Sequence, residues 1–348
     1  MNIRNYLSLF IAWGRSLNPW IKIVVKEFKL NRDCFGLRFA LQKSLTDFNK
    51  KISHRYSSKW RANEYEHSVI EAYLIRRGYL NFMKETMNQK LPPPRHPSTP
   101  LDLTGNIGNK CPIWVCWWQG ENSMPSIVKI CYERLCKKSG MHPVILISLD
   151  NYSKYVAIPD FLVKKAVSHK LKFAHLADLL RLKLLAMYGG LWIDSTILLS
   201  RPIKNIYTDA PFMTLKNPPF FNQSVSVYRW SSFFMGAGIS ARPYMAALSV
   251  AMEKYLLTER SMIHYLLIDY FIDLLYKNSK GFKTMVDAIP CRNLNLHTLR
   301  EQQNQVYDKN KWEKWVETTD FFKMSYHEKI LEFLNGRRTY YGYIVNSL

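Results

Sequence analysis

The 348-residue sequence predicts an α/β fold in which a mostly parallel sheet carries flanking helices and follows a helical N-terminal extension. After residue 110, short apolar runs alternate with segments of helical periodicity, the pattern of parallel strands joined by crossover helices. Before that point the chain has few glycines and is rich in Leu, Phe, Lys and Glu, which favours helix. We therefore expect a helical extension at 1–90, a Pro-rich linker at 91–110, a sheet domain at 111–330 and a C-terminal tail at 331–348.

The elements of the sheet domain are predicted from apolar periodicity and from glycine and proline breaks. A short run without polar alternation indicates a strand that is buried on both faces. Glycine pairs and stacked prolines end such segments. In chain order we expect a strand at Pro112–Trp118, a helix at Pro125–Lys138, a strand at His142–Leu149, a helix at Phe173–Tyr188, a strand from Leu191, β-like pieces at Phe212–Leu215 and Tyr228–Phe234, and helices at Tyr244–Leu257 and Ile263–Tyr276.

The chain is strongly basic, with a formal net charge of +22, and 18 Lys and Arg against 7 Asp and Glu lie within residues 1–100. Such a field attracts nucleic acid, anionic lipid headgroups and nucleotide phosphates alike. Hydrophobic residues at 47% and charged residues at 22% exclude a disordered chain. No zinc-finger spacing, aromatic RNA-binding box or basic zipper occurs in the sequence, so we expect no nucleic-acid partner.

The six cysteines and the N-terminus bear on location. Two C-x4-C spacings are wider than the usual zinc pair, so buried free thiols in a reducing cytoplasm are the preferred interpretation. Tyr6–Trp13 is apolar but is interrupted by Gly14-Arg15 without a cleavage site. Two interpretations stay open for this segment: a buried helix, or an interfacial helix on the inner face of the plasma membrane.

One segment predicts chemistry. Asp178 and Arg181 are three residues apart on the expected helix, so they share a face and can meet the same ligand. Gly189-Gly190 allows the chain to reverse. Asp194 follows the next apolar strand, and in parallel sheets ligands bind beyond the carboxyl ends of the strands. Each feature alone also fits a plain structural role, such as a helix ion pair, but their order together favours a binding site.

This order, D-x-x-R, about a dozen residues and then G-G-x-W-I-D, resembles the sugar-binding signature of glycosyltransferases with the GT-A fold, and most of all the capsular polysaccharide synthesis protein family. Ile113–Gly120, Trp230–Ala237 and Leu267–Tyr270 resemble the same family. The resemblance covers about residues 110–325 and not residues 1–90. It implies a GT-A-like domain that moves a sugar, with retention, from a nucleotide-diphosphate donor, foremost a UDP-sugar, to a glycan acceptor that is polyprenyl-linked in capsule synthesis.

The resemblance also implies roles for individual residues. Asp178 and Arg181 match the pair that holds the ribose and sugar of the donor, and Asp194 matches the first carboxylate of D-x-D. These three are our expected catalytic residues. For donor binding we expect Trp118, in stacking on the base, with Gln119, Gly189, Gly190, Ser195 and Thr196. For the acceptor or sugar we expect Asp269, Tyr270 and Gly236, although a structural Asp269 is an equal alternative.

Thr196 stands where the family carries the second carboxylate of D-x-D, which puts a Mn²⁺ or Mg²⁺ cofactor in doubt because these cations prefer carboxylate oxygen. Three outcomes stay open: weak metal binding through Asp194, a further ligand such as His327, or metal-free catalysis in which His327 and Lys323 neutralise the diphosphate. A non-catalytic protein that binds sugar nucleotides or glycans on the same fold is the alternative function.

Overall fold

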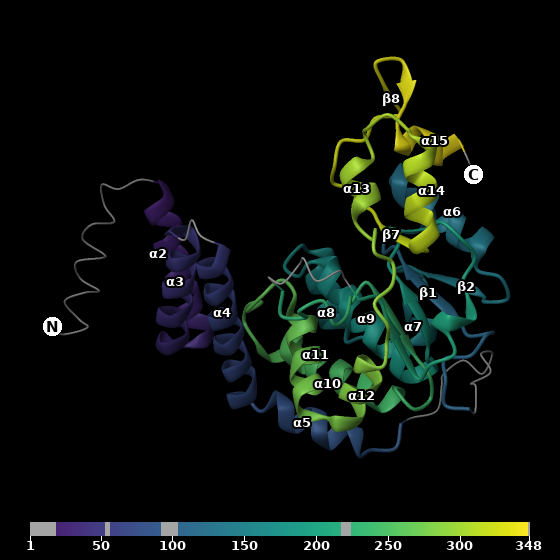
Figure 1. Cartoon of the computed structure of the whole chain (residues 1–348). Coiled ribbons are helices and arrows are strands. Elements are labelled where there is room, and N and C mark those ends of the chain that lie inside the picture. Colours follow the sequence, from purple (N-terminus) through teal and green to yellow (C-terminus); the bar gives the residue numbers. More distant parts are fainter. Residues whose placement is uncertain (1–18, 53–55, 92–103, 217–223, 347–348) are drawn as a thin grey trace.

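A computed structural model describes residues 19–52, 56–91, 104–216 and 224–346 (Figure 1). Its central sheet has the strand order β2-β1-β3-β6-β5. β1 is parallel to both of its neighbours, whereas β6 is antiparallel to β3 and β5. The fold is therefore mixed α/β with a mostly parallel sheet, as predicted. The strands are β1 (Ile113–Cys116), β2 (Val144–Ile147), β3 (Gly190–Ile193), β5 (Phe212–Thr214) and β6 (Phe234–Ala237).

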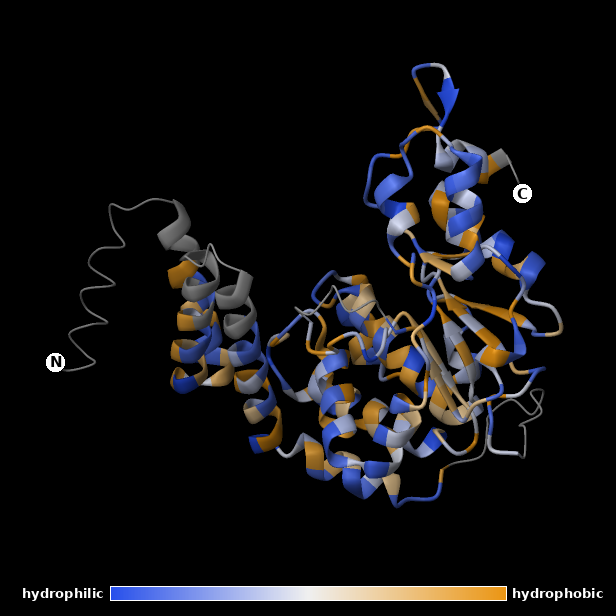
Figure 2. Cartoon of the chain, in the orientation of Figure 1, coloured by the Kyte–Doolittle hydropathy of each residue, from blue (hydrophilic) through white to orange (hydrophobic). Residues whose placement is uncertain are grey.

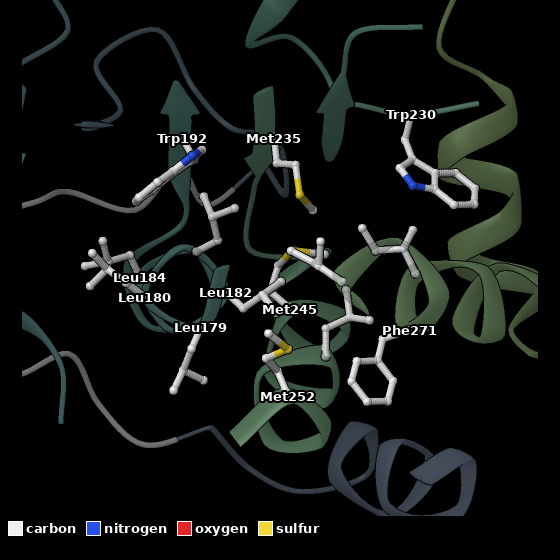
Figure 3. Packing of buried hydrophobic residues seen from close by; sticks show 14 of the residues in the cluster. Leu179, Leu180, Leu182, Leu184, Trp192, Trp230, Met235, Met245, Met252 and Phe271 are labelled. Atoms are coloured by element: carbon white, nitrogen blue, oxygen red, sulfur yellow. The ribbon is translucent and has the colours of Figure 1, made fainter. Parts of the chain in front are cut away.

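Helices α9 and α10 pack together beside the sheet, and Figure 3 shows their side chains meeting those of β3 and β6. Leu179 and Leu184 of α9, Trp192 of β3 and Met245 of α10 are at most 1% exposed. Each such side chain stabilises the fold by about 1.5–3 kcal/mol through burial. The helices of the sheet domain are α6 (Ser126–Lys138), α7 (Tyr152–Tyr155), α8 (Asp160–Val167), α9 (Phe173–Tyr188), α10 (Arg242–Thr258), α11 (Leu267–Asn278) and α12 (Lys280–Asp287).

The predicted strand at Tyr228–Phe234 is wrong. The strand β6 begins only at Phe234, and the residues before it form turns. Val227 and Tyr228 have positive φ, and the Arg229 guanidinium donates to the carbonyls of Val225 and Ser226 at 3.0 and 2.9 Å. Such local side-chain bonds to the backbone compete with a sheet ladder.

A second, smaller unit lies at the C-terminal side of the sheet. β4 (Ile197–Leu199) pairs antiparallel with β7 (Phe321–Lys323), and both pack against α6 in a separate core. The expected C-terminal tail is a hairpin and a helix whose Ile344 is fully buried. The remaining elements are the short 3₁₀ turns Glu121–Ser123 and Asn205–Tyr207, α13 (Thr298–Gln302), α14 (Lys309–Thr318), β8 (Phe333–Leu334), β9 (Arg337–Arg338) and α15 (Tyr340–Asn346).

The N-terminal region is helical, as predicted, with α2 (Pro19–Phe35), α3 (Leu37–Ile52), α4 (Tyr56–Arg76) and α5 (Tyr79–Met87). α4 and α5 are tied to the sheet domain through buried Glu259, which accepts from Tyr73, Tyr79 and Arg77 at 2.8–3.0 Å. α2 and α3 lie beside α4 at the edge of the molecule (Figure 1). The predicted Pro-rich linker largely, and Tyr6–Trp13 entirely, fall outside the described residues.

Two further expectations have an outcome in the structure. Within the described part of the chain, no helix is both long and apolar enough to cross a bilayer. All six cysteines are free thiols, as predicted, but only Cys111, Cys116 and Cys131 are buried; Cys136 and Cys291 are exposed. The prediction of buried thiols is therefore wrong for Cys136 and Cys291, and Cys34 is only partly buried.

Candidate active site

Asp194 lies where β3 ends, at the carboxyl edge of the parallel strands. Its backbone N–H donates to the Phe233 carbonyl at 2.9 Å, and its own carbonyl accepts from Ile197 at 2.9 Å, which closes the turn into β4. β1 runs parallel to β3 in register Trp114↔Trp192, so the residues after β1 reach the same edge. This is the edge at which ligands bind in open α/β sheets.

Arg181 joins the two predicted carboxylates. Its Nη1 lies 3.1 Å from Asp178 Oδ1, one helical turn away, and its Nη2 lies 3.1 Å from Asp194 Oδ1. The guanidinium also lies over the Trp192 ring at 5.0 Å, and the Trp192 indole N–H donates to Asp194 Oδ1 at 2.8 Å. Asp178, Arg181 and Asp194 thus converge on one place.

Arg181 is only 4% exposed, yet part of its guanidinium is unused. Among the described residues, Nε and Nη1 have no hydrogen-bond acceptor, and the Nη1–Asp178 contact is an ion pair without hydrogen-bond geometry. An unsatisfied buried donor costs about 1–3 kcal/mol. A ligand oxygen placed here would remove that cost.

Lys323 approaches Asp194 from the other side. It lies on β7, 129 residues along the chain, and its ammonium donates to Asp194 Oδ2 at 2.9 Å and to Thr196 Oγ1 at 2.8 Å. The pairing of Ile197 with Lys323 between β4 and β7 places it there. The Lys323 and Asp194 side chains remain 19% and 25% exposed, so solvent reaches the pair.

The carboxylates of the site differ in pKa. Burial raises the pKa of Asp178 to about 7, with Asp194 and Asp269 adding to the rise and Arg181 opposing it. Burial likewise raises the pKa of Asp269 to about 6. Burial would also raise the pKa of Asp194, but Lys323 and Arg181 outweigh it and lower that pKa below its usual value. Asp194 is therefore the permanently ionised member, a division of roles typical of functional sites.

The residues around Asp194 do not fit a divalent cation. One carboxylate oxygen faces Arg181 and Trp192 and the other faces Lys323. In the described ranges there is no group of three His, Cys, Asp or Glu side chains that could hold a metal. His327 is exposed and lies against the Tyr326 ring, 4.0 Å between ring centres. Asp194 and His327, which we expected as metal ligands, therefore do not belong to such a group.

The structure reverses the expected burial of the two tryptophans after β1. Trp118 is 5% exposed, packs against Phe173 and donates to its carbonyl at 3.1 Å, so it is a core residue. Trp117 is partly exposed and contacts the Tyr326 ring edge-on at 5.4 Å. Gln119 is exposed and Ser195 partly exposed, so both can reach a ligand at this edge.

The predicted glycines do not lie at the site. Gly189 caps α9 and Gly190 begins β3, at the end of the strand opposite to Asp194. Both have positive φ, and a Cβ on Gly190 would lie 2.4 Å from the Pro112 carbonyl oxygen. A Cβ on Gly236 would meet Ile107 and Leu191 at 2.6 Å. Gly190 and Gly236 therefore require glycine for close packing, and Gly189 is favoured by its positive φ.

The two α11 residues that we expected at the site have different surroundings. Tyr270 is 2% exposed, and its hydroxyl is bonded to His67 Nδ1 of α4 at 2.8 Å, so it joins α11 to the N-terminal helices. Asp269 accepts from the Trp230 indole at 3.0 Å and lies within electrostatic reach of Asp178 and Arg181. Asp269 therefore borders the site, whereas Tyr270 does not.

Two residues of the site carried no sequence prediction. Trp192 lies inside the recognised motif, and its position two residues before Asp194 was the available signal. Tyr265 is 56% exposed, lies edge-on to His175 at 5.5 Å, and has Lys172 Nζ 5.1 Å from its ring. Nothing in the local sequence around Tyr265 distinguishes it from a surface aromatic.

Comparison with known proteins gives one match. No curated protein and no solved structure matches the chain. The model of the family described as capsular polysaccharide synthesis protein matches residues 50–344. The match includes α4, α5 and α15, so the resemblance extends further than about 110–325 and does reach into residues 1–90. With most of its length matched, the chain belongs to the capsular polysaccharide synthesis protein family.

Proposed function

We propose that the protein is a glycosyltransferase of the GT-A type that moves a sugar from a nucleotide-diphosphate donor, foremost a UDP-sugar, to a glycan acceptor in capsular or surface polysaccharide synthesis. The observation that carries the proposal is the convergence of Asp178, Arg181, Asp194 and Lys323 at the carboxyl edge of the sheet. Family membership supports a biosynthetic role. The resemblance to glycosyltransferases with the GT-A fold adds the expectation that the transfer retains configuration.

The chemistry of the four side chains suits this reaction. A leaving diphosphate gathers negative charge in the transition state and needs fixed donors around it. Arg181 offers two nitrogens, Nε and Nη1, that have no hydrogen-bond acceptor among the described residues, and Lys323 offers an ammonium. Asp178 and Asp269 are acceptors for sugar or ribose hydroxyls.

The nucleotide base has an aromatic contact available. Trp117 and Tyr326 come from two distant parts of the chain, and their rings meet at the edge that carries Asp194. Stacking of a base on such a ring contributes about 1–3 kcal/mol in single-stranded nucleic acid complexes. We assign the base to Trp117, in place of the buried Trp118.

A nucleotide-sugar panel tests the proposed function. Selective donors should raise the melting temperature, because ligands that bind only the folded state stabilise it, and the same donors should support transfer or slow hydrolysis. Asp194→Asn should lose both effects, since it loosens Arg181 and Lys323 together. The exposed Asp209→Asn is the matched control and should behave as wild type.

The outcomes separate the alternatives. A selective shift without turnover by any donor would identify a non-catalytic binding protein. No shift with any nucleotide sugar, combined with steeply salt-dependent retention on any polyanion, would identify a nucleic-acid binder instead.

We also propose that α3 rests on an anionic membrane surface at the inner leaflet. Leu37, Leu41 and Leu45 repeat every four residues along one face of α3 and are 43%, 39% and 59% exposed. Hydrophobic residues lie on the outer side of the helices here, away from the sheet (Figure 2). Contiguous exposed apolar residues on a soluble domain mark an interaction surface.

The charge of the region selects lipid as the occupant of this leucine face. Residues 1–52 contain 10 Lys and Arg and 3 Asp and Glu, and Arg38 is exposed beside Leu37 and Leu41. Basic residues near an anionic bilayer each contribute about 1 kcal/mol. A glycosyltransferase acting on a polyprenyl-linked acceptor would gain access to its substrate from this position.

Co-sedimentation with vesicles tests the membrane proposal. Wild type should bind vesicles containing phosphatidylglycerol and not neutral phosphatidylcholine vesicles, and the pair of changes Leu41→Glu and Leu45→Glu should abolish binding. Leu257→Glu is a matched control, because Leu257 is 42% exposed on a different helix. Binding that ignores lipid charge, or that persists in the double variant, would contradict the proposal.

A further inference from the structure

We propose that the Lys323 ammonium takes the place of a divalent metal ion in this site, so that the donor diphosphate is bound and released without Mn²⁺ or Mg²⁺. The inference rests on the proposed function and deepens it. Its starting point is the position of Lys323 Nζ, 2.9 Å from Asp194 Oδ2 and 2.8 Å from Thr196 Oγ1. These are the two side chains that correspond to the carboxylates of D-x-D.

Within the part of the chain that the structure describes, the Lys323 ammonium donates to two side-chain oxygens. An ammonium has three donors and no acceptor. Two of them are directed at Asp194 and Thr196. The third is available to an oxygen of the diphosphate, and the side chain is 19% exposed, so a ligand can reach it.

The charges around Asp194 also disfavour a bound divalent ion. Asp194 is one anion between two cations, Arg181 at 3.1 Å and Lys323 at 2.9 Å. A divalent ion on Asp194 would have to lie within a few ångströms of both cations, and like charges this close together repel strongly. The site therefore already holds the positive charge that a metal would bring.

Thr196 supports the replacement of a metal ion by Lys323. A carboxylate at this position would pair with the ammonium and cancel its charge. A hydroxyl instead accepts the Lys323 hydrogen bond and stays neutral, so the charge of Lys323 remains directed at the ligand. The Phe233 ring, 4.7 Å from Nζ, adds a further cation–π contact that holds the ammonium in place.

The transfer step balances without a metal. The bond between the anomeric carbon and the diphosphate oxygen breaks, and its electron pair stays on that oxygen. The acceptor hydroxyl oxygen forms the new bond to the anomeric carbon, and its proton passes to the departing diphosphate. Lys323 keeps its own protons throughout and stabilises the charge on the leaving oxygen by hydrogen bonding.

Calorimetry with nucleoside diphosphates tests the inference. UDP, GDP and CDP are titrated into the full-length protein in excess EDTA and again in millimolar Mn²⁺. The preferred diphosphate should bind with the same affinity in both. Lys323→Gln should weaken its binding by about tenfold or more and lower kcat by about 10²–10³, the effect of losing one donor to a developing anion. The exposed Lys329→Gln is the matched control.

Each outcome decides something. Binding to wild type that requires Mn²⁺ would overturn the inference and leave the proposed function standing. Unchanged affinity and turnover in Lys323→Gln would also overturn it. Absence of binding by every diphosphate, with and without Mn²⁺, would overturn the proposed function and the inference together. The wild-type comparison needs no variant, so it decides the question even if Lys323→Gln folds poorly.

Discussion

Replacing Arg181 with methionine is expected to abolish sugar transfer and to lower the free energy of unfolding by about 3–5 kcal/mol. The guanidinium is the shared cation of Asp178 and Asp194 and also acts on Asp269. Methionine fills a similar volume but leaves these carboxylates without their partner, and an uncompensated buried charge is costly. The nucleotide-sugar donor would at the same time lose Nε and Nη1 of Arg181 as hydrogen-bonding partners.

Urea unfolding and a transfer assay measure the two effects separately. Arg242→Met is the matched control, because Arg242 is 6% exposed and donates to the Ala186 carbonyl at 2.7 Å, toward the other end of α9. It should cost stability with far less effect on turnover per folded molecule. Adding Asp178→Asn to Arg181→Met should recover part of the stability and none of the transfer. Substantial transfer by Arg181→Met would contradict the assigned role of the guanidinium.

The part of the site that could be predicted from sequence is the part built from local geometry. Asp178 and Arg181 meet because residues three apart share a helix face. Asp194 follows within the same helix–strand unit, so its place at the strand end needed only the correct α9 and β3. The fold class followed in the same way from apolar runs and glycine breaks.

What could not be predicted depends on long-range pairing. Lys323 reaches Asp194 because β7 pairs with β4 across more than a hundred residues. The sequence of neither short strand indicates which strand it pairs with. From the sequence alone, Lys323 is therefore only one of two candidate cations, beside His327. Alternation along a strand places the side chains of Trp117 and Trp118 on opposite faces of the sheet, but it does not reveal which face is covered by other elements.

The glycines show a second limit of predicting the site from sequence. Gly189 and Gly190 belong to the same sequence motif as Asp178, Arg181 and Asp194, and this proximity in sequence suggested a shared role in ligand binding. Their conformation and the Pro112 carbonyl that crosses over Gly190 explain them without a ligand. A residue can thus be required by a functional motif because it positions the backbone that carries the functional side chain.

Replacing Asp178 with asparagine is expected to abolish or strongly reduce transfer while making the fold more stable above pH 7. The pKa of Asp178 is about 7 in the folded protein, against an ordinary value near 3.8. Because the folded state binds the proton more tightly than the unfolded state, wild type loses stability as the pH rises from about 4 to about 7. Three pKa units correspond to about 4 kcal/mol at most, and we expect about 2–4 kcal/mol.

Urea unfolding of wild type and Asp178→Asn at pH 5 and pH 8 measures this effect. The difference in unfolding free energy should move in favour of the variant between the two pH values, because asparagine has no charge to bury. Asp150→Asn, at an exposed position, should show no such change. A pH-independent difference for Asp178→Asn would mean that the carboxylate is ionised at little cost in the fold. If the expected change is found together with lost transfer, Asp178 is held in an unfavourable charged state for binding the donor, since a residue kept only for stability would be better as the amide.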